Sequence, residues 1–337
     1  MSSRPENSTT VRIETRAPPR ALRAGLAALR AVSPPLAEIL AARLFLTPPP
    51  TGRAPSGLPG AIPFVVEAGG VAVRGERVGQ GPAVLLVHGW GGRGAQLAPL
   101  ARPLLEAGLS VALFDGPAHG ASGGRTTNLV RMAGAVAAVA RHVGARAAIG
   151  HSFGGAAMGI ALARGLALDA AVVVGAPSSP LGFLGTFCDA LGIPAVAREG
   201  LQRRLERWVG VPMRSLDAAT LLPRIAVPAL VVHDARDREI PLRDGEAIAA
   251  AWPGARLVRT EGLGHRRILR DPGVAAAIAA FVQERLARCG CGRLATGRTR
   301  AGEPACGTCR LSLHLEDVRA RRAYGIGYGA GVGIGVG

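Results

Sequence analysis

From residue 83 onward, short apolar runs alternate with longer segments rich in Ala, Leu and Arg. The short runs predict buried strands, and the segments between them are long enough for crossover helices. This alternation is typical of a doubly wound, mostly parallel sheet that is covered on both faces. The predicted strands are 83–87, 110–114, 147–149, 171–174, 229–232 and 255–258. Upstream, 63–67 and 71–74 flank Gly69-Gly70, which indicates an antiparallel hairpin at the sheet edge.

The segment before this hairpin has a different pattern. In 21–32 and 36–46, apolar residues recur at spacings of three and four with Arg between them, which predicts two amphipathic helices. We expect these helices to pack on the main domain; the alternative is peripheral membrane contact through residues 21–46. Pro and Gly between 47 and 60 indicate a linker. Residues 1–58 are therefore predicted to form an N-terminal helical segment and a Pro-rich linker.

The predicted α/β domain spans 59–287 and contains one long interruption. Residues 177–228 exceed an ordinary connection and carry Leu, Phe and Trp208 at helical spacing. This segment is predicted to be a helical cap or lid over the carboxyl ends of the strands, where it would line a substrate pocket. A plain additional pair of helices is the alternative.

The composition of the chain predicts a large hydrophobic core and a strongly positive net charge. Apolar residues make up 48% of the 337 residues, and the formal net charge is +17. All 40 basic residues are Arg, dispersed among few aromatic residues, so we interpret them as a solvated surface and expect no specific nucleic-acid partner. Neither a membrane-spanning apolar run nor a signal-peptide pattern is found in the sequence, which predicts a cytoplasmic protein.

Most of the cysteines lie in one segment, 288–312. Cys289, Cys291, Cys306 and Cys309 form two close pairs beside glycines, a pattern that suits a tetrahedral structural zinc ion in a zinc knuckle. Disulfides or free thiols are the alternatives. Four protein ligands would close such a site, so the zinc would not be catalytic. The following residues, 313–337, are rich in glycine and are predicted to be disordered.

The strongest candidate for chemistry lies where a predicted strand meets a predicted helix. Residues 150–154 read Gly-His-Ser-Phe-Gly, which fits the G-x-S-x-G nucleophile elbow around Ser152. Small residues on both sides of the serine are a steric requirement of that turn. A glycine-rich turn with an incidental serine is the alternative interpretation.

Two further turns follow strands at the same edge. His88-Gly-Trp-Gly-Gly92 has glycines that let backbone N–H groups face a pocket. We assign the oxyanion-hole donors to the backbone N–H groups of Trp90 and Phe153. The turn at 115–122 is interpreted as scaffold, with His119 hydrogen-bonded within it.

An acid and a histidine follow in the second half of the chain. Asp234, Asp237 and Glu239 lie just beyond a predicted strand, where an acid could orient a histidine, and His265 lies in a Gly-flanked loop after the last strand. The order serine, acid, histidine is that of the α/β-hydrolase arrangement and differs from the orders in chymotrypsin and subtilisin.

Together, these motifs resemble the α/β-hydrolase superfamily from about residue 61 to residue 286. The matching pieces are H-G-W-G-G, D-G-P-A-H-G-A-S, G-H-S-F-G-G, H-D-A-R-D-R-E-I-P and G-L-G-H, in the order of the family. The resemblance implies a triad of Ser152, Asp237 and His265 that forms an acyl-enzyme and needs no cofactor for catalysis.

We therefore expect a serine hydrolase that cleaves carboxylic esters or thioesters with a hydrophobic acyl group. An acyltransferase with the same triad is an alternative, and so is a non-catalytic binding protein on a hydrolase scaffold. Four arginines near the triad raise a second substrate hypothesis, an anionic substrate such as a coenzyme A thioester. They are Arg236, Arg238, Arg266 and Arg267.

Overall fold

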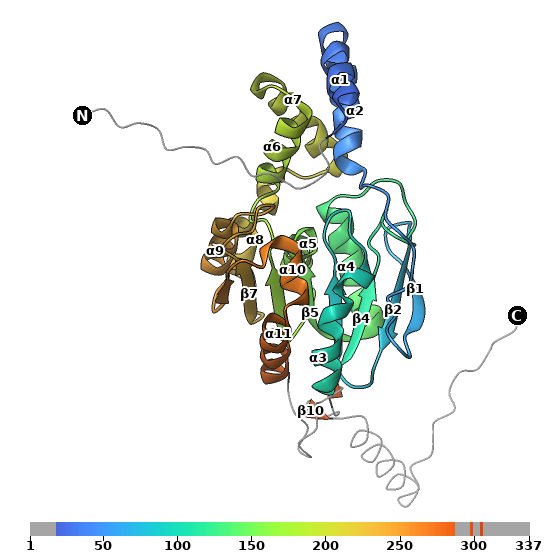
Figure 1. Ribbon diagram of the computed structural model, residues 1–337, viewed down its shortest axis with the longest axis vertical. Helices are drawn as coiled ribbons and strands as arrows, with labels where there is room; N and C mark the ends of the chain where they lie inside the picture. The colour runs from blue at the N-terminus through green and yellow to red at the C-terminus, as the bar shows by residue number, and fades with distance from the viewer. Residues whose placement is uncertain (1–17, 287–296, 299–303, 306–337) are drawn as a thin grey trace, which may run out of the picture. The chain divides into compact units, whose positions relative to one another are not determined.

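Eight strands form a single sheet in the order β1-β2-β4-β3-β5-β6-β7-β8 (Figure 1). From β3 to β8 all neighbouring strands are parallel, whereas β1 and β2 pair antiparallel and β2 joins β4 antiparallel. The structure is a computed structural model that describes residues 18–286, 297–298 and 304–305. The strands are β1 (Ile62–Glu67), β2 (Ala72–Val78), β3 (Ala83–Val87), β4 (Ser110–Phe114), β5 (Ala145–His151), β6 (Ala170–Val174), β7 (Ala229–Asp234) and β8 (Arg256–Thr260). The predicted α/β-hydrolase fold with a mostly parallel sheet is confirmed.

Helices connect the strands and cover both faces of the sheet. They are α3 (Ala101–Glu106), α4 (Leu129–Val143), α5 (Phe153–Ala163), α8 (Ala218–Leu221), α9 (Leu242–Ala251), α10 (Gly264–Arg267) and α11 (Pro272–Arg285). Local signals explain their ends: in α4, the Asn128 side chain accepts a hydrogen bond from the Arg131 N–H, and Gly144 ends the helix in a left-handed conformation.

The main core lies between the sheet and one layer of helices. Side chains from β3 and β4 alternate, so that Leu85, Val87 and Phe114 face a buried cluster containing Met158 of α5 and Trp252. Helices α4 and α9 belong to the same cluster, whereas α3 and α11 contact each other and lie outside it. Since both faces are covered, the central strands are apolar throughout, as the sequence pattern predicts.

A second hydrophobic cluster lies apart from the sheet. Helices α1 (Arg20–Val32), α2 (Pro34–Leu46), α6 (Pro180–Leu191) and α7 (Ala195–Val209), here called the cap bundle, gather at one end of the unit that holds the sheet (Figure 1). Its buried residues include Leu26 and Ala42 from the first pair of helices and Leu184 and Leu201 from the second. The two predicted N-terminal helices thus exist, but they pack on the insertion between β6 and β7 rather than on the main core. Periodicity predicted their buried face and could not predict its partner.

The Pro-rich segment after α2 runs along the sheet domain without regular structure, and several of its groups make hydrogen bonds to it. The Thr51 hydroxyl accepts from the Gly120 N–H at 2.9 Å, and the Ala54 carbonyl accepts from Arg93 at 2.7 Å. Those contacts tie the cap bundle to the domain that contains the sheet.

The chain divides into two units, residues 1–285 and 286–337. Within the second unit, β9 (Gly297–Arg298) and β10 (Pro304–Ala305) pair antiparallel. The four cysteines of the predicted zinc knuckle and the Gly-rich segment 313–337 lie outside the described residues. Among the residues that are described, no helix is both long enough and apolar enough to cross a membrane.

Candidate active site

Ser152 occupies a strained turn between β5 and α5. Its φ of 53° and ψ of −124° place a non-glycine residue at positive φ, which persists only where the surroundings enforce it. A Cβ atom on Gly154 would lie 2.4 Å from the Val87 carbonyl oxygen, and one on Gly150 would lie 2.6 Å from the Cα of Gly155. The flanking small residues are therefore a steric necessity, as the sequence predicts, and the half-buried Ser152 side chain remains accessible.

The turn after β3 lies against this elbow. A Cβ on Gly89 would be 3.1 Å from the Cβ of Ser152, so any larger residue would crowd the elbow. In the part of the chain that the structure describes, the backbone N–H groups of Trp90 and Phe153 have no hydrogen-bond acceptor. Unpaired donors on both sides of a serine are what an oxyanion hole requires.

Two buried histidines hold the turn after β3 in place. His88 donates from Nδ1 to the Gly89 carbonyl at 2.7 Å and accepts at Nε2 from the Gly116 N–H at 2.8 Å. His119 accepts at Nε2 from the Gly91 N–H at 3.1 Å. Burial, and then the proximity of His119, lower the pKa of His88 to about 3, so that His88 is neutral. Both rings are thus structural, and His119 also donates from Nδ1 to the Pro117 carbonyl at 3.0 Å, within the 115–122 turn as the sequence predicts.

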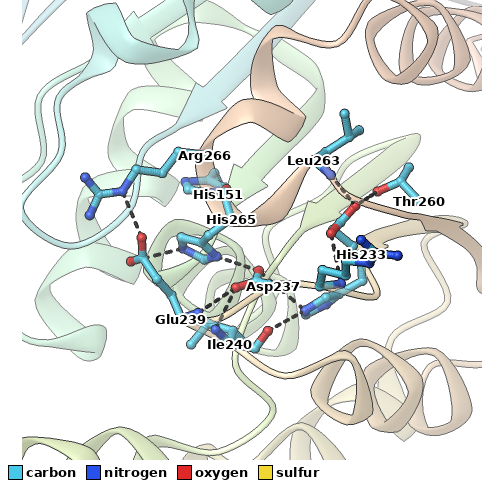
Figure 2. A network of polar contacts seen from close by, with 11 residues as sticks. His151, His233, Asp237, Glu239, Ile240, Thr260, Leu263, His265 and Arg266 are labelled. Atoms are coloured by element: carbon cyan, nitrogen blue, oxygen red, sulfur yellow. Dashed lines mark hydrogen bonds and ion pairs between the residues drawn. The ribbon is translucent and has the colours of Figure 1, made fainter. Parts of the chain in front are cut away.

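Asp237 and His265 meet at the carboxyl ends of β7 and β8. His265 Nδ1 lies 2.7 Å from Asp237 Oδ2, and the carboxylate is almost completely buried (Figure 2). The other oxygen, Oδ1, accepts from the backbone N–H groups of Glu239 and Ile240 at 2.8 and 2.9 Å. A carboxylate fixed in this way holds the imidazole with its proton on Nδ1, leaving Nε2 as the basic atom.

Asp234, the other aspartate that the sequence offers as a candidate acid, has a different set of hydrogen-bond partners. It accepts hydrogen bonds from the Thr260 hydroxyl at 2.8 Å and from the backbone N–H groups of Leu263 and Arg236 at 3.0 and 2.9 Å. Burial alone would raise the pKa of Asp234, but hydrogen bonds from backbone N–H groups and from Thr260 lower it overall. Asp234 therefore fixes the two loops that carry Asp237 and His265.

His151, the residue before the serine, joins the elbow to the histidine loop. Its Nε2 donates to the His265 carbonyl at 2.9 Å, and the two rings lie 4.6 Å apart between centroids. Burial, and then the proximity of His265, lower the pKa of His151 to about 3, so it remains a neutral donor. No local sequence pattern indicates this role for His151, because its contact spans 114 positions along the chain.

Glu239 is a second carboxylate beside His265. Its Oε2 lies 3.9 Å from His265 Nε2, and its Oε1 accepts from Arg266 Nε at 2.9 Å (Figure 2). From the sequence, Glu239 is only one of three candidate acids for orienting the histidine. In the structure Asp237 fills that position, and Glu239 faces the opposite nitrogen.

A row of aromatic side chains leads from the elbow into the cap bundle. Trp90 lies 5.3 Å from Phe153 and 6.3 Å from Phe183 of α6 between ring centroids. Phe45 of α2 continues the row at 5.6 Å from Phe183 and 5.1 Å from Phe187. These five half-buried rings, the aromatic row, place an apolar surface next to the serine. Sequence patterns gave no sign that Phe45 belongs to this site.

An apolar pocket is found elsewhere, between α5 and the helices at the base of the insertion. Its lining comprises Leu129, Gly155, Ala156, Gly159, Val173, Ala176, Pro177, Ser178, Ser179, Pro180, Leu216, Ala218, Leu221, Leu222, Ile248 and Trp252. Ser152, Asp237 and His265 are not among its lining residues.

The sequence profile of the alpha/beta hydrolase family matches residues 84–278, which is more than half of the chain, so the chain belongs to the alpha/beta hydrolase family. One relative is the pimeloyl-[acyl-carrier protein] methyl ester esterase of Stenotrophomonas maltophilia. The two are 32% identical over 246 residues, covering 60% of this chain and 94% of the relative. The enzyme of the same name from Neisseria meningitidis is 35% identical over 133 residues, 39% of each chain. These relatives and the family identify the protein as a hydrolytic esterase.

Solved structures agree on the fold. An esterase from Exiguobacterium antarcticum superposes with a TM-score of 0.53 at 18% identity, covering 65% of this chain and 99% of that one. A bacterial membrane phospholipase A gives a TM-score of 0.52 at 19% identity, covering 78% of this chain and 92% of that one. At such low identity these likenesses concern the fold alone.

Proposed function

We propose that this esterase is a serine hydrolase that works through an acyl-enzyme on Ser152. The observation that carries the proposal is the 2.7 Å bond between His265 Nδ1 and Asp237, on a loop that His151 ties to the Ser152 elbow. An acid, a base and a strained serine at neighbouring strand ends are the parts that acyl transfer needs. Neither a metal nor an organic cofactor is needed for these steps.

In the first half-reaction, Ser152 Oγ attacks the ester carbonyl while His265 Nε2 takes its proton. Asp237 stabilises the imidazolium, and the N–H groups of Trp90 and Phe153 stabilise the oxyanion. The protonated His265 then gives its proton to the departing alcohol as the bond to the acyl carbon breaks. In the second half-reaction, water cleaves the acyl-enzyme and restores the serine.

We infer that the substrate is a carboxylic ester with an apolar acyl group. The aromatic row supports this, because an acyl chain leaving Ser152 along Trp90 and Phe183 would exchange water for ring surface. The named relatives act on a pimeloyl-[acyl-carrier protein] methyl ester, which is also an acyl ester of a small alcohol. A thioester is the second substrate class to test.

An anionic substrate has less support. Arg236 pairs with Glu261 at 2.8 Å, and Arg266 pairs with Glu239 at 2.9 Å. Arg267 donates to two backbone carbonyls of its own loop. Those three guanidinium groups are therefore already engaged by groups of the chain itself.

Membrane contact through residues 21–46 also has less support. Leu26 and Leu46, which such contact would use, are buried within the cap bundle, and the exposed large apolar residues of this segment are Val32 and Leu36. A protein that acts in the cytoplasm remains our proposal.

The test is hydrolysis of p-nitrophenyl esters and acyl thioesters of increasing chain length by the wild type and Ser152→Ala, with fluorophosphonate labelling of both. We expect kcat to fall by about four orders of magnitude or more and labelling to vanish in the variant. An optimum at longer acyl chains would support the apolar substrate.

Two results would contradict the proposal. A folded wild type that neither turns over nor labels would indicate a binding protein on a hydrolase scaffold. Product that goes mainly to an added alcohol or amine, with little free acid, would indicate an acyltransferase.

A further inference from the structure

Glu239 faces the nitrogen of His265 that Asp237 does not hold. Oε2 lies 3.9 Å from Nε2, which is too far for a direct hydrogen bond. The carboxylate is only 14% exposed, whereas its partner Arg266 is 69% exposed. Glu239 thus sits inside the reaction site, and Arg266 reaches it from the surface.

The position of the Glu239 carboxylate is fixed from two directions. Its backbone N–H donates to Asp237 Oδ1 at 2.8 Å, and its Oε1 accepts from Arg266 Nε at 2.9 Å. Oε2 is consequently left to face His265 (Figure 2). In the same loop, one carboxylate orients the imidazole and the next holds an acceptor opposite its basic atom.

Once Ser152 is acylated, its Oγ no longer carries a proton for His265 Nε2, and both atoms across this 3.9 Å gap are acceptors. The neutral imidazole carries its proton on Nδ1 toward Asp237, so Nε2 presents a lone pair, and a carboxylate oxygen only accepts. A group with two donors satisfies both atoms. A water oxygen at about 2.8 Å from each would subtend an angle of about 90°, which a water molecule tolerates.

We propose that Glu239 positions the hydrolytic water for deacylation. This inference rests on the proposed acyl-enzyme on Ser152. One O–H of the water points to His265 Nε2 and the other to Glu239 Oε2, which leaves a lone pair for the acyl carbon. As the new C–O bond forms, the proton moves to Nε2. The bond from the acyl carbon to Ser152 Oγ then breaks, and the proton on Nε2 returns to Oγ.

The same geometry favours hydrolysis over transfer to an alcohol. An alcohol has a single O–H donor, so it can satisfy Nε2 or Oε2 but not both, and an acceptor left unpaired in a buried site is costly. Glu239 therefore acts as a positioning residue that selects water as the acyl acceptor.

The experiment is single-turnover kinetics with p-nitrophenyl butyrate, comparing the wild type with Glu239→Ala. Release of p-nitrophenol reports acylation, and intact-protein mass spectrometry of quenched samples reports decay of the acyl-enzyme. We expect acylation to stay within about twofold and decay to slow about tenfold or more. In the presence of methanol, the ratio of methyl ester to free acid should rise by a similar factor.

Three further variants sharpen the test. Glu261→Ala removes a carboxylate from an exposed pair with Arg236 at the same end of the sheet and should change neither step. Glu239→Asp keeps the charge and should restore part of the decay rate. Arg266→Gln keeps the carboxylate but releases Oε1, and should slow decay less than Glu239→Ala does.

The experiment distinguishes failure of the proposed function from failure of the inference about Glu239. A wild type that forms no acyl-enzyme would overturn the proposed function together with this inference. A normal acyl-enzyme whose decay and methanol partition are the same in Glu239→Ala would overturn the inference alone. An equal loss in both steps would also overturn it, because it would show that Glu239 only supports the Asp237 loop.

Discussion

The catalytic domain, which contains the sheet of β1 to β8, and the cap bundle differ in how their parts are held together. In the catalytic domain, Ser152, Asp237 and His265 follow strand ends of one parallel sheet, so the hydrogen-bonded ladder sets where they lie. The cap bundle joins helices from the start of the chain to helices inserted between β6 and β7, and it is held by its own small hydrophobic cluster. The placement of the candidate catalytic residues thus depends on the sheet, whereas the proposed acyl-binding surface depends on packing between distant helices. Four experiments test this contrast.

The largest effect is expected at Asp237, the proposed triad acid. Asp237→Asn should lower kcat by about three to four orders of magnitude, because an amide no longer holds His265 in the reactive tautomer. Asp234→Asn is the matched control, because the partners of Asp234 are Thr260 and two backbone N–H groups. This variant should lower the melting temperature but leave kcat of the folded enzyme nearly unchanged. The reverse result, with kcat lost in Asp234→Asn alone, would reassign the triad acid.

The folding stability of the catalytic domain should also decrease at acid pH. His88 and His151 have pKa values near 3 in the folded chain, against about 6.5 in an unfolded chain. The contribution of these two neutral histidines to the unfolding free energy is fully present above pH 6.5. It is lost as the pH falls toward 3, because in that range only the unfolded state gains protons. Between pH 7 and pH 5 each histidine should cost about 2 kcal/mol of unfolding free energy.

Urea unfolding at both pH values measures this loss. His88→Gln should show a smaller loss between pH 7 and pH 5 than the wild type does. Substitution of the exposed His142 serves as the surface control. An identical loss in His88→Gln and the wild type would exclude His88 as a source of the acid sensitivity.

In the cap bundle, Phe45 should affect substrate choice rather than chemistry. Phe45→Ala removes a ring from the aromatic row, so kcat/KM for long-chain esters should fall about tenfold while that for acetate esters changes little. Phe64→Ala, on β1 beside His142, is the matched control and should leave the chain-length profile unchanged. A uniform decrease at all chain lengths in Phe45→Ala would instead indicate a general loss of structure.

The smallest effect is expected for the ion pair between the two halves of the cap bundle. Glu38 of α2 and Arg204 of α7 lie 3.1 Å apart and are partly exposed. Glu38→Gln should cost about 1 kcal/mol of stability or less and leave kcat within about twofold. A larger loss by urea unfolding would show that charge, rather than the Leu and Ala cluster, holds the N-terminal helices in place.

The sequence by itself determined the sheet and the candidate residues. Apolar runs located β3 to β8, and the glycines around Ser152 specified the elbow, because these features depend on local sterics and periodicity. The choice of Asp237 over Asp234 came from the resemblance, and the hydrogen bond of His265 to Asp237 now supports it.

Only the tertiary structure decided which distant residues meet. Periodicity shows that α1 and α2 have a buried face, but α6 and α7 cover it, and so Phe45 reaches the aromatic row. Likewise, Glu239 is a loop carboxylate in the sequence, and only the fold turns it toward His265 Nε2 while Asp237 takes Nδ1. A local pattern encodes what a segment buries; its partner depends on long-range packing that short patterns do not record.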